Sequence, residues 1–231
     1  MNPFAPEALF ALEGYAHREL FLGVENAWEA LPRLAAYLKE KLRPGVRGTV
    51  EPGAHIFGDD VEIAEGARVE AGAYIRGPAL IGPGTEVRHG AYIRGNVLTG
   101  QKCVIGHDTE CKGAIFLDHA KAAHFAYVGD SILGNDVNLG AGTKLANLKV
   151  VAGSVDVLSP EGRPVATGLR KLGAILGDGV ELGCNAVSSP GTVVGKGSLV
   201  YPLASIRGTI PPHTIVAWKP KLDMKPRRER G

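Results

Sequence analysis

Aliphatic residues recur every six positions along the middle of the chain. The phase runs from residue 63 to 117 without a slip and is occupied by Ile63, Val69, Ile75, Ile81, Val87, Ile93, Thr99, Ile105, Cys111 and Leu117. A period of six fits neither an amphipathic helix nor a simple alternating strand. It is typical of a hexapeptide-repeat solenoid, the parallel β-helix, in which each unit supplies one short strand with one inward residue.

A second phase marks the corners between these strands. Three residues after six of these ten positions stand Gly66, Gly72, Gly84, Gly90, Asn96 and Asp108. Glycine adopts positive φ freely, and Asn and Asp tolerate it better than other residues. Three units then form one triangular coil of about 18 residues, and coils stack at about 4.8 Å. Such sequences are typical of the left-handed form, an exception to the right-handed crossover rule.

Residues 1–48 lack the period and predict a short N-terminal α-helical cap. Pro6 suits the first position of a helix, and Pro32 could open a second helix that reaches about Leu42. We expect this segment to be a lid over the open end of the solenoid, because such an end exposes unpaired strand edges and apolar core. The β-helix itself is predicted over 49–217, and a basic tail over 218–231.

Two interruptions of the period predict inserted loops. After Leu117 the aliphatic phase resumes at Tyr127, ten residues on, so four extra residues should bulge out within 118–126. The second break, 147–173, contains the turn sequence Ser159-Pro160-Glu161-Gly162 between two β-rich runs and predicts a protruding hairpin. Insertions in solenoids gather on one face, where binding surfaces usually lie.

Composition narrows the class of partner. The 231 residues carry a net charge of only +2, which gives no reason to expect nucleic acid as a partner. No apolar run approaches the roughly 18 residues of a membrane span, and no secretory signal is evident. The three cysteines cannot all pair, and Cys103 and Cys111 occupy core phases. We therefore expect a cytoplasmic protein with reduced cysteines.

The string from Lys121 to Asn147 resembles one family of acyltransferases. It contains His124, the run Tyr127-Val128-Gly129-Asp130, and Asn138. It is similar to the acetyltransferase domain of the bifunctional bacterial enzyme that makes UDP-N-acetylglucosamine, and to the C-terminal half of archaeal sugar-1-phosphate nucleotidylyltransferases. The likeness extends over about 50–217. It implies acetyl transfer from acetyl-CoA to an amino-sugar 1-phosphate, glucosamine 1-phosphate being the first candidate, by a homotrimer with sites between subunits.

The resemblance also implies roles for single residues. His124 falls on the position of the general base, a task that suits an imidazole because it titrates near neutral pH. Arg94 and Lys112 fall on positions that hold the sugar phosphate, which Arg can grip with two hydrogen bonds and Lys with a point charge. The positions that orient sugar phosphate and amine are Tyr127, Asn138 and Asn147. The pattern alone leaves open a core role for Tyr127, backbone capping for the two Asn, and solvated charges for Arg94 and Lys112.

Coenzyme binding is less readable. By the same resemblance, Cys184 falls where the family has a small polar residue beside the coenzyme, and Arg170 and Lys171 could meet its phosphates. Tyr201-Pro202 departs from the small residues usual in that coil. Proline has no N–H, so one backbone donor expected by the coenzyme is missing.

Two other functions stay open. Pro202 and the lack of a Gly-rich phosphate loop in residues 1–48 would also suit a non-catalytic sugar-phosphate or nucleotide-sugar binding relative, and this chain alone is not expected to transfer nucleotides. His119 and His124, with His89 or His107, resemble the zinc histidines of γ-class carbonic anhydrase, which would need three protein ligands and an open position. The leading interpretation includes no metal.

Overall fold

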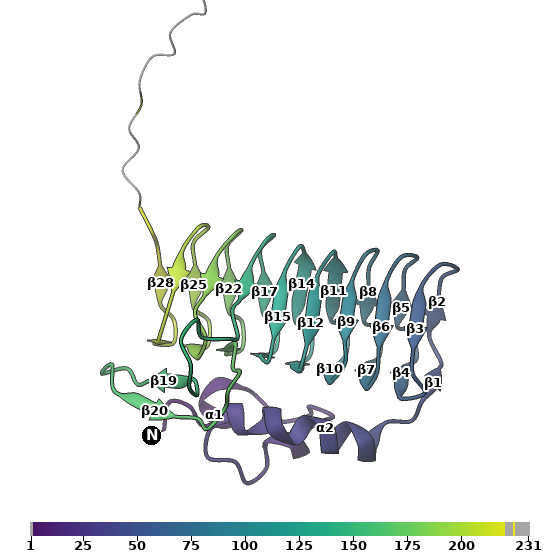
Figure 1. The fold of residues 1–231 in the computed structure, drawn as a ribbon, viewed down its shortest axis with the longest axis horizontal. Coiled ribbons are helices and arrows are strands. Elements are labelled where there is room, and N and C mark those ends of the chain that lie inside the picture. The colour runs from purple at the N-terminus through teal and green to yellow at the C-terminus, as the bar shows by residue number, and fades with distance from the viewer. Residues whose placement is uncertain (1, 220–223, 225–231) are drawn as a thin grey trace, which may run out of the picture.

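Three parallel sheets wind into one solenoid in the computed structural model, which describes residues 2–219 and 224 (Figure 1). The parallel β-helix predicted from the six-residue period is confirmed. Most of the basic tail expected over 218–231 lies outside the described residues. Within them, no helix combines the length and hydropathy that crossing a bilayer requires.

Each sheet takes every third strand of the solenoid. Sheet A contains β1 (Gly45–Val46), β4 (Val61–Ile63), β7 (Ala79–Ile81), β10 (Val97–Thr99), β13 (Ala114–Phe116), β16 (Ile132–Leu133), β21 (Ala174–Leu176), β24 (Thr192–Val194) and β27 (Thr209–Ile210). Sheet B contains β2 (Thr49–Val50), β5 (Arg68–Val69), β8 (Glu86–Val87), β11 (Val104–His107), β14 (Lys121–His124), β17 (Asn138–Leu139), β22 (Glu181–Leu182), β25 (Leu199–Val200) and β28 (Ile215–Val216). Sheet C contains β3 (His55–Phe57), β6 (Tyr74–Arg76), β9 (Tyr92–Arg94), β12 (Glu110–Lys112), β15 (Tyr127–Gly129), β18 (Lys144–Leu145), β23 (Val187–Ser188) and β26 (Ser205–Ile206).

One residue of each strand fills the bore. On sheet C, Ile75, Ile93, Cys111 and Val128 lie in register on successive coils, and all four are fully buried. No coil can bury such a residue by itself, so neighbouring coils stabilise one another. In each three-residue strand of sheet C the first and third side chains therefore point outward.

The expected bulge over 118–126 is wrong. Lys121–His124 is strand β14, paired with β11 on one side and β17 on the other. Leu98 pairs with Leu80, eighteen residues back, whereas Ile115 pairs with Leu98, seventeen back. The coils here are one residue shorter, and the phase shifts instead of breaking.

The phase shift changes which side chains enter the bore. Phe116 pairs with Thr99 and fills the bore, while Leu117 packs outside it. Val128, not Tyr127, then takes the core position of β15. Tyr127 points outward, so a core role for it is excluded.

The N-terminal segment lies along the solenoid instead of over its end. Its elements are α1 (Pro6–Leu9), η1 (Arg18–Phe21), η2 (Ala27–Glu29) and α2 (Ala30–Lys41), with Pro6 in the first turn as expected. They form one apolar cluster with outward residues of sheet A: Leu80, Leu98, Ile115, Ile132, Ile175 and Val193. The segment predicted as a lid over the end therefore covers one side of the solenoid instead (Figure 1). Burial of this apolar row explains the placement, because a sheet with both faces apolar must be covered on both.

The hairpin predicted within 147–173 is confirmed. Strands β19 (Asp156–Leu158) and β20 (Pro164–Ala166) pair antiparallel, and the turn is closed by a hydrogen bond from Ser159 N to Arg163 O. Val155 and Val157 join the cluster of the N-terminal segment. Both irregular parts of the chain thus cover sheet A, and the outer faces of sheets B and C are left for a site.

Candidate functional site

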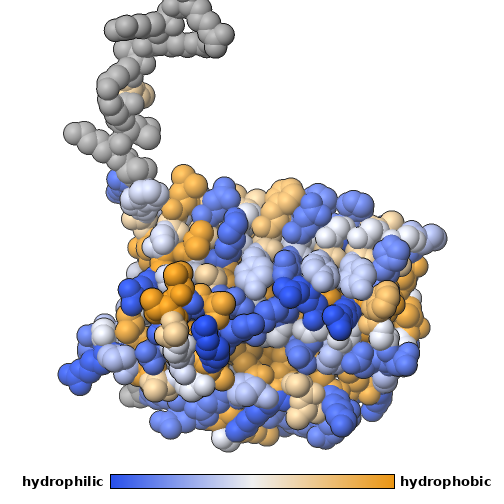
Figure 2. All heavy atoms as spheres, viewed as in Figure 1, coloured by the Kyte–Doolittle hydropathy of each residue, from blue (hydrophilic) through white to orange (hydrophobic). Residues whose placement is uncertain are grey.

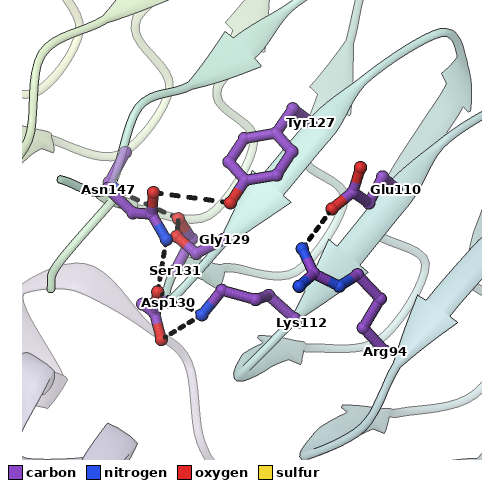
Figure 3. A network of polar contacts seen from close by, with 9 residues as sticks. Arg94, Glu110, Lys112, Tyr127, Gly129, Asp130, Ser131 and Asn147 are labelled. Atoms are coloured by element: carbon purple, nitrogen blue, oxygen red, sulfur yellow. Dashed lines mark hydrogen bonds and ion pairs between the residues drawn. The ribbon is translucent and has the colours of Figure 1, made fainter. Parts of the chain in front are cut away.

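Four of the residues named from the sequence meet on the outer face of sheet C. Arg94, Lys112 and Tyr127 come from β9, β12 and β15, and Asn147 follows β18 (Figure 3). They converge because successive parallel strands in register place outward side chains side by side. Seen as in Figure 1, hydrophilic residues gather over the middle coils (Figure 2).

Asp130 holds the centre of this network. Lys112 Nζ lies 2.8 and 3.1 Å from its two carboxylate oxygens, and Asn147 Nδ2 also donates to it. The hydroxyl of Tyr127 donates to Asn147 Oδ1 at 3.4 Å. A buried amide that both donates and accepts fixes its neighbours in one arrangement. The backbone-capping alternative for Asn147 is therefore not what its side chain does.

Gly129 makes room for that arrangement. A Cβ built on it would lie 2.7 Å from Tyr127 Oη and 2.6 Å from Asn147 Nδ2, closer than such atoms can approach. The glycine after Val128 is thus required by the side chains above it.

Arg94 has its own carboxylate partner. Its Nη1 lies 2.6 Å from Glu110 Oε1, and this hydrogen bond raises the pKa of Arg94 above its usual value. Both side chains are exposed by more than a third, so the pair contributes little to stability. It holds the guanidinium over the strand ends, beside Lys112.

Sequence reasoning missed both carboxylates. Asp130 stands in the string that carried the resemblance, and its position after Gly129 was the available signal. Glu110 lies in the same outward row as Tyr92 and Tyr127, one strand on from Tyr92. That placement becomes visible only once the register is known.

His124 lies at the corner between sheets B and C. It ends β14, is exposed, and pairs in register with His107 of β11. His124 stands three residues before Tyr127, which lies on sheet C, on the other side of the corner. The imidazole is outside the bore, as a general base must be.

A groove continues along sheet B from this corner. It has a volume of about 390 Å³, and among its lining residues are Asn138, Cys184, Tyr201 and Pro202. Asn138 therefore does not join the network of Tyr127 and Asn147 on sheet C. The predicted site divides into two parts, one on each side of the corner that His124 occupies.

Arg170 and Lys171 lie away from that groove. Both are exposed, and Arg170 Nη1 donates to Gly153 O at 3.4 Å within the 147–173 insertion. The backbone after them returns to the network, since Leu172 N donates to Asn147 O and Gly173 N to Asp130 O. They thus approach the network from the edge between sheets C and A, and Cys184 does not share their surroundings.

The three cysteines differ in access to solvent. Cys103 and Cys111 are fully buried in the bore, and burial raises the pKa of Cys103 to about 12. Burial raises the pKa of Cys111 as well. Cys184 is exposed. Cys184, which lines the groove, is thus the one thiol of the three that is accessible to solvent.

The zinc alternative lacks its ligands. His119 and His124 flank opposite ends of β14, and His119 Nδ1 lies 3.1 Å from Asp136 Oδ1. Across the part of the chain that the structure describes, no three His, Cys, Asp or Glu side chains are grouped to hold a metal ion. The described residues therefore give no support to a zinc enzyme.

Known proteins match the region of the chain that carries this network. Residues 75–160 match the family described as GMPPB C-terminal domain. The bifunctional sugar-1-phosphate nucleotidylyltransferase/acetyltransferase of Sulfurisphaera tokodaii is 38% identical over 159 residues, which are 69% of this chain and 39% of that protein. The bifunctional protein GlmU of Methanocaldococcus jannaschii is 34% identical over 193 residues, 84% of this chain and 46% of that protein.

This chain resembles part of the GlmU-type bifunctional proteins. It spans less than half the length of these two curated relatives. Among solved structures, the UDP-N-acetylglucosamine acyltransferase of Francisella novicida aligns with a TM-score of 0.49 and 16% identity, over 74% of this chain and 65% of that one. The match to the GMPPB C-terminal domain covers the coils that carry the network, since residues 75–160 include Arg94, Lys112, Tyr127 and Asn147.

Proposed function

We propose that this chain is an acetyl-CoA-dependent N-acetyltransferase that acts on an amino-sugar 1-phosphate. The observation that carries the proposal is the convergence of Arg94, Lys112, Tyr127 and Asn147 on one face (Figure 3), with the exposed His124 three residues before Tyr127 in the chain. The name of the Sulfurisphaera tokodaii relative combines sugar-1-phosphate nucleotidylyltransferase and acetyltransferase activities. Of those two, the β-helix with its corner groove suits acetyl transfer.

Arg94 and Lys112 are the groups that we assign to the acceptor phosphate. Each is already held by a carboxylate, Glu110 or Asp130, so both cations are in place before a ligand binds. A phosphate can accept from the remaining N–H groups of each side chain without displacing those partners. Tyr127 and Asn147, fixed to one another, then orient the sugar.

His124 is the group that we assign to proton transfer. The amine nitrogen attacks the thioester carbonyl carbon of acetyl-CoA, the new C–N bond forms and the C–S bond breaks. The amine proton passes to the imidazole, and the sulfur leaves as the thiolate of coenzyme A. No covalent enzyme intermediate is required, and a base in this role typically contributes roughly 10²–10⁴-fold.

The groove on sheet B is the proposed path of the coenzyme. Cys184 and Asn138 line it and lie on the same side of the corner as His124. Pro202 also lines it and offers no N–H to the pantetheine arm. Arg170 and Lys171 remain candidates for coenzyme phosphates, reached from the edge between sheets C and A.

A homotrimer would complete such a site. The N-terminal segment and the hairpin cover sheet A, which leaves the corner between sheets B and C for contact with further copies. Substrate and coenzyme groups lie on two faces of one corner, so a neighbouring chain would supply the wall that excludes water from the reaction. Light scattering tests this, and a monomer at assay concentration would contradict it.

The decisive experiment measures thiol release from acetyl-CoA with a panel of amino-sugar 1-phosphates, glucosamine 1-phosphate first. His124→Ala should lower turnover by about a hundred-fold or more, while circular dichroism stays that of the wild type. The matched control is His107→Ala, which removes the neighbouring imidazole in register on β11. Equal turnover in wild type and His124→Ala would end the assignment.

One observation favours a second candidate, a non-catalytic sugar-phosphate binding protein. Pro202 in the groove removes a backbone donor where a coenzyme would lie. That protein would bind glucosamine 1-phosphate in calorimetry, with Lys112→Ala weakening the binding, and would release no thiol with any acceptor of the panel. Thiol release by the wild type excludes it.

A further inference from the structure

The outer face of sheet C extends beyond the network, toward the first coils. Here Phe57, Arg76 and Arg94 lie in register on β3, β6 and β9, and the pairing of Cys111 with Ile93 places Lys112 next in the row. At about 4.8 Å between strands, the row from Lys112 to Phe57 is about 14 Å long. It holds three cations in succession and ends on an aromatic ring.

A second row of rings runs beside the first. The Phe57 and Tyr74 rings are stacked with centroids 5.6 Å apart and planes 19° from parallel. Tyr74 meets Tyr92 edge-on at 5.5 Å, and the Arg94 guanidinium lies 5.8 Å from the Tyr92 ring centre. Phe57 is nevertheless 60% exposed and Tyr92 42%. The rings therefore pack against one another and remain partly accessible to solvent.

Arg76 differs from the other two cations of the row. Arg94 is paired with Glu110 and Lys112 with Asp130, but Arg76 has no ion pair or side-chain hydrogen bond among the described residues. An exposed arginine between a paired arginine and a bare phenyl ring is a place for an anion attached to a flat ring.

We infer that this face binds the nucleoside diphosphate part of a nucleotide-linked amino sugar, so that the acceptor is larger than a sugar 1-phosphate. The inference rests on the proposed acetyl transfer at the same site. The phosphate nearest the sugar lies at Lys112 and Arg94, the second phosphate at Arg76, and the base stacks on Phe57. Every base has a π-face, so the platform accepts more than one nucleobase.

Charge and continuity favour this occupant. The cations form one line that leads from the residues assigned to the sugar phosphate, and a diphosphate needs adjacent cations in that order. A polymer of nucleotides would need more positive charge than a chain of net charge +2 supplies. A second copy of the chain on this face is the remaining occupant, and the experiment below tests it.

The test measures binding of uridine diphosphate, guanosine diphosphate and inorganic pyrophosphate by calorimetry. Phe57→Ala should weaken uridine diphosphate roughly ten-fold or more, as loss of a base–aromatic stack implies, and leave pyrophosphate unchanged. Arg76→Gln should weaken all three. The matched controls are Trp218→Ala, another exposed aromatic, and Arg88→Gln, an arginine that directly follows β8.

Neither substitution should alter glucosamine 1-phosphate binding or its acetylation, which keeps this inference separable from the proposed function. Acetylation of glucosamine 1-phosphate without uridine or guanosine diphosphate binding overturns the inference alone. Equal diphosphate binding by wild type and Phe57→Ala also overturns it. So does a change of oligomeric state in Phe57→Ala, since that result assigns the face to a second copy.

Discussion

Lys112 and Asp130 form an ion pair in which Nζ lies 2.8 Å from Oδ2, and each side chain is only about one-fifth exposed. The same carboxylate accepts from Asn147, whose amide oxygen accepts from Tyr127. One acidic residue therefore connects three residues that the sequence nominated separately. The pair holds the ammonium in place, and Lys112 keeps a further N–H that can donate to an anion.

Removing the cation of this pair should weaken binding of the acceptor more than binding of the coenzyme. Lys112→Ala deletes a charged hydrogen-bond donor, a change that we expect to weaken glucosamine 1-phosphate binding by roughly ten- to a hundred-fold. Calorimetry measures this directly. Lys39→Ala, an exposed lysine of α2, serves as the control and should bind as the wild type does. Unaltered affinity in Lys112→Ala would remove this residue from the phosphate site.

Alkylation should distinguish Cys184 from the other two cysteines. Cys103 and Cys111 are fully buried, and burial raises the pKa of both thiols, which keeps them protonated and out of reach. In the native protein we expect iodoacetamide to label Cys184 alone, as mass spectrometry of the peptides would show.

Acetyl-CoA should protect that thiol, because Cys184 lines the proposed coenzyme groove. The labelling rate should fall several-fold at saturating coenzyme. A rate that does not change with acetyl-CoA would place the coenzyme elsewhere, and Cys184→Ser protein checks that the label is assigned to the right residue.

Docking of the N-terminal segment should weaken in mild acid. Burial lowers the pKa of His17 below its usual 6.5, against smaller opposing effects of Asp118, Glu62 and Glu19. Below pH 6.5 the unfolded chain then binds more protons than the folded one, so His17 contributes stability above pH 6.5 that is lost as the pH falls through the lowered pKa.

The stability advantage of wild type over His17→Gln should therefore shrink from neutral pH to below 6.5. Urea unfolding measures it, followed by fluorescence of Trp28, which is buried in the same segment. A difference between the two proteins that is independent of pH would show that docking does not lower the pKa of His17.

The shifted register predicts a large effect at Phe116. This ring is fully buried in the bore, so Phe116→Ala should cost about 3–5 kcal/mol of unfolding free energy. Phe125, which is 53% exposed, is the matched control, and Phe125→Ala should stay within about 0.5 kcal/mol of the wild type. Similar losses at both positions would contradict the register.

Much of the site could be named from the sequence because the resemblance lies in a contiguous string. His124, Tyr127 and Asn147 were found in that way, and the structure places Tyr127 and Asn147 in contact. Glu110 and Asp130 were missed, since a carboxylate on a strand is also an ordinary solvated residue. Their roles depend on which side chain lies beside them on the neighbouring strand, and the local sequence pattern does not specify that.

The interruptions of the period were harder to interpret. The hairpin over 147–173 was correctly predicted, because its length and turn residues leave no place for it in a coil. The segment 118–126 was taken for a bulge, since counting from Leu117 assumed the wrong inward residue. Two coils that are each one residue short and a single insertion of four give the same spacing along the chain, and only strand pairing distinguishes them.

What the amino-acid order determined by itself was the solenoid: a six-residue period leaves one inward side chain per strand, and stacked coils bury such a series in one bore. Tertiary structure alone decided where the irregular parts go. The N-terminal segment through α2 covers sheet A because Leu98, Ile115 and Ile132 point outward there and need a partner. This placement leaves the corner of sheets B and C open. It is decided by apolar contacts between segments that are distant in sequence.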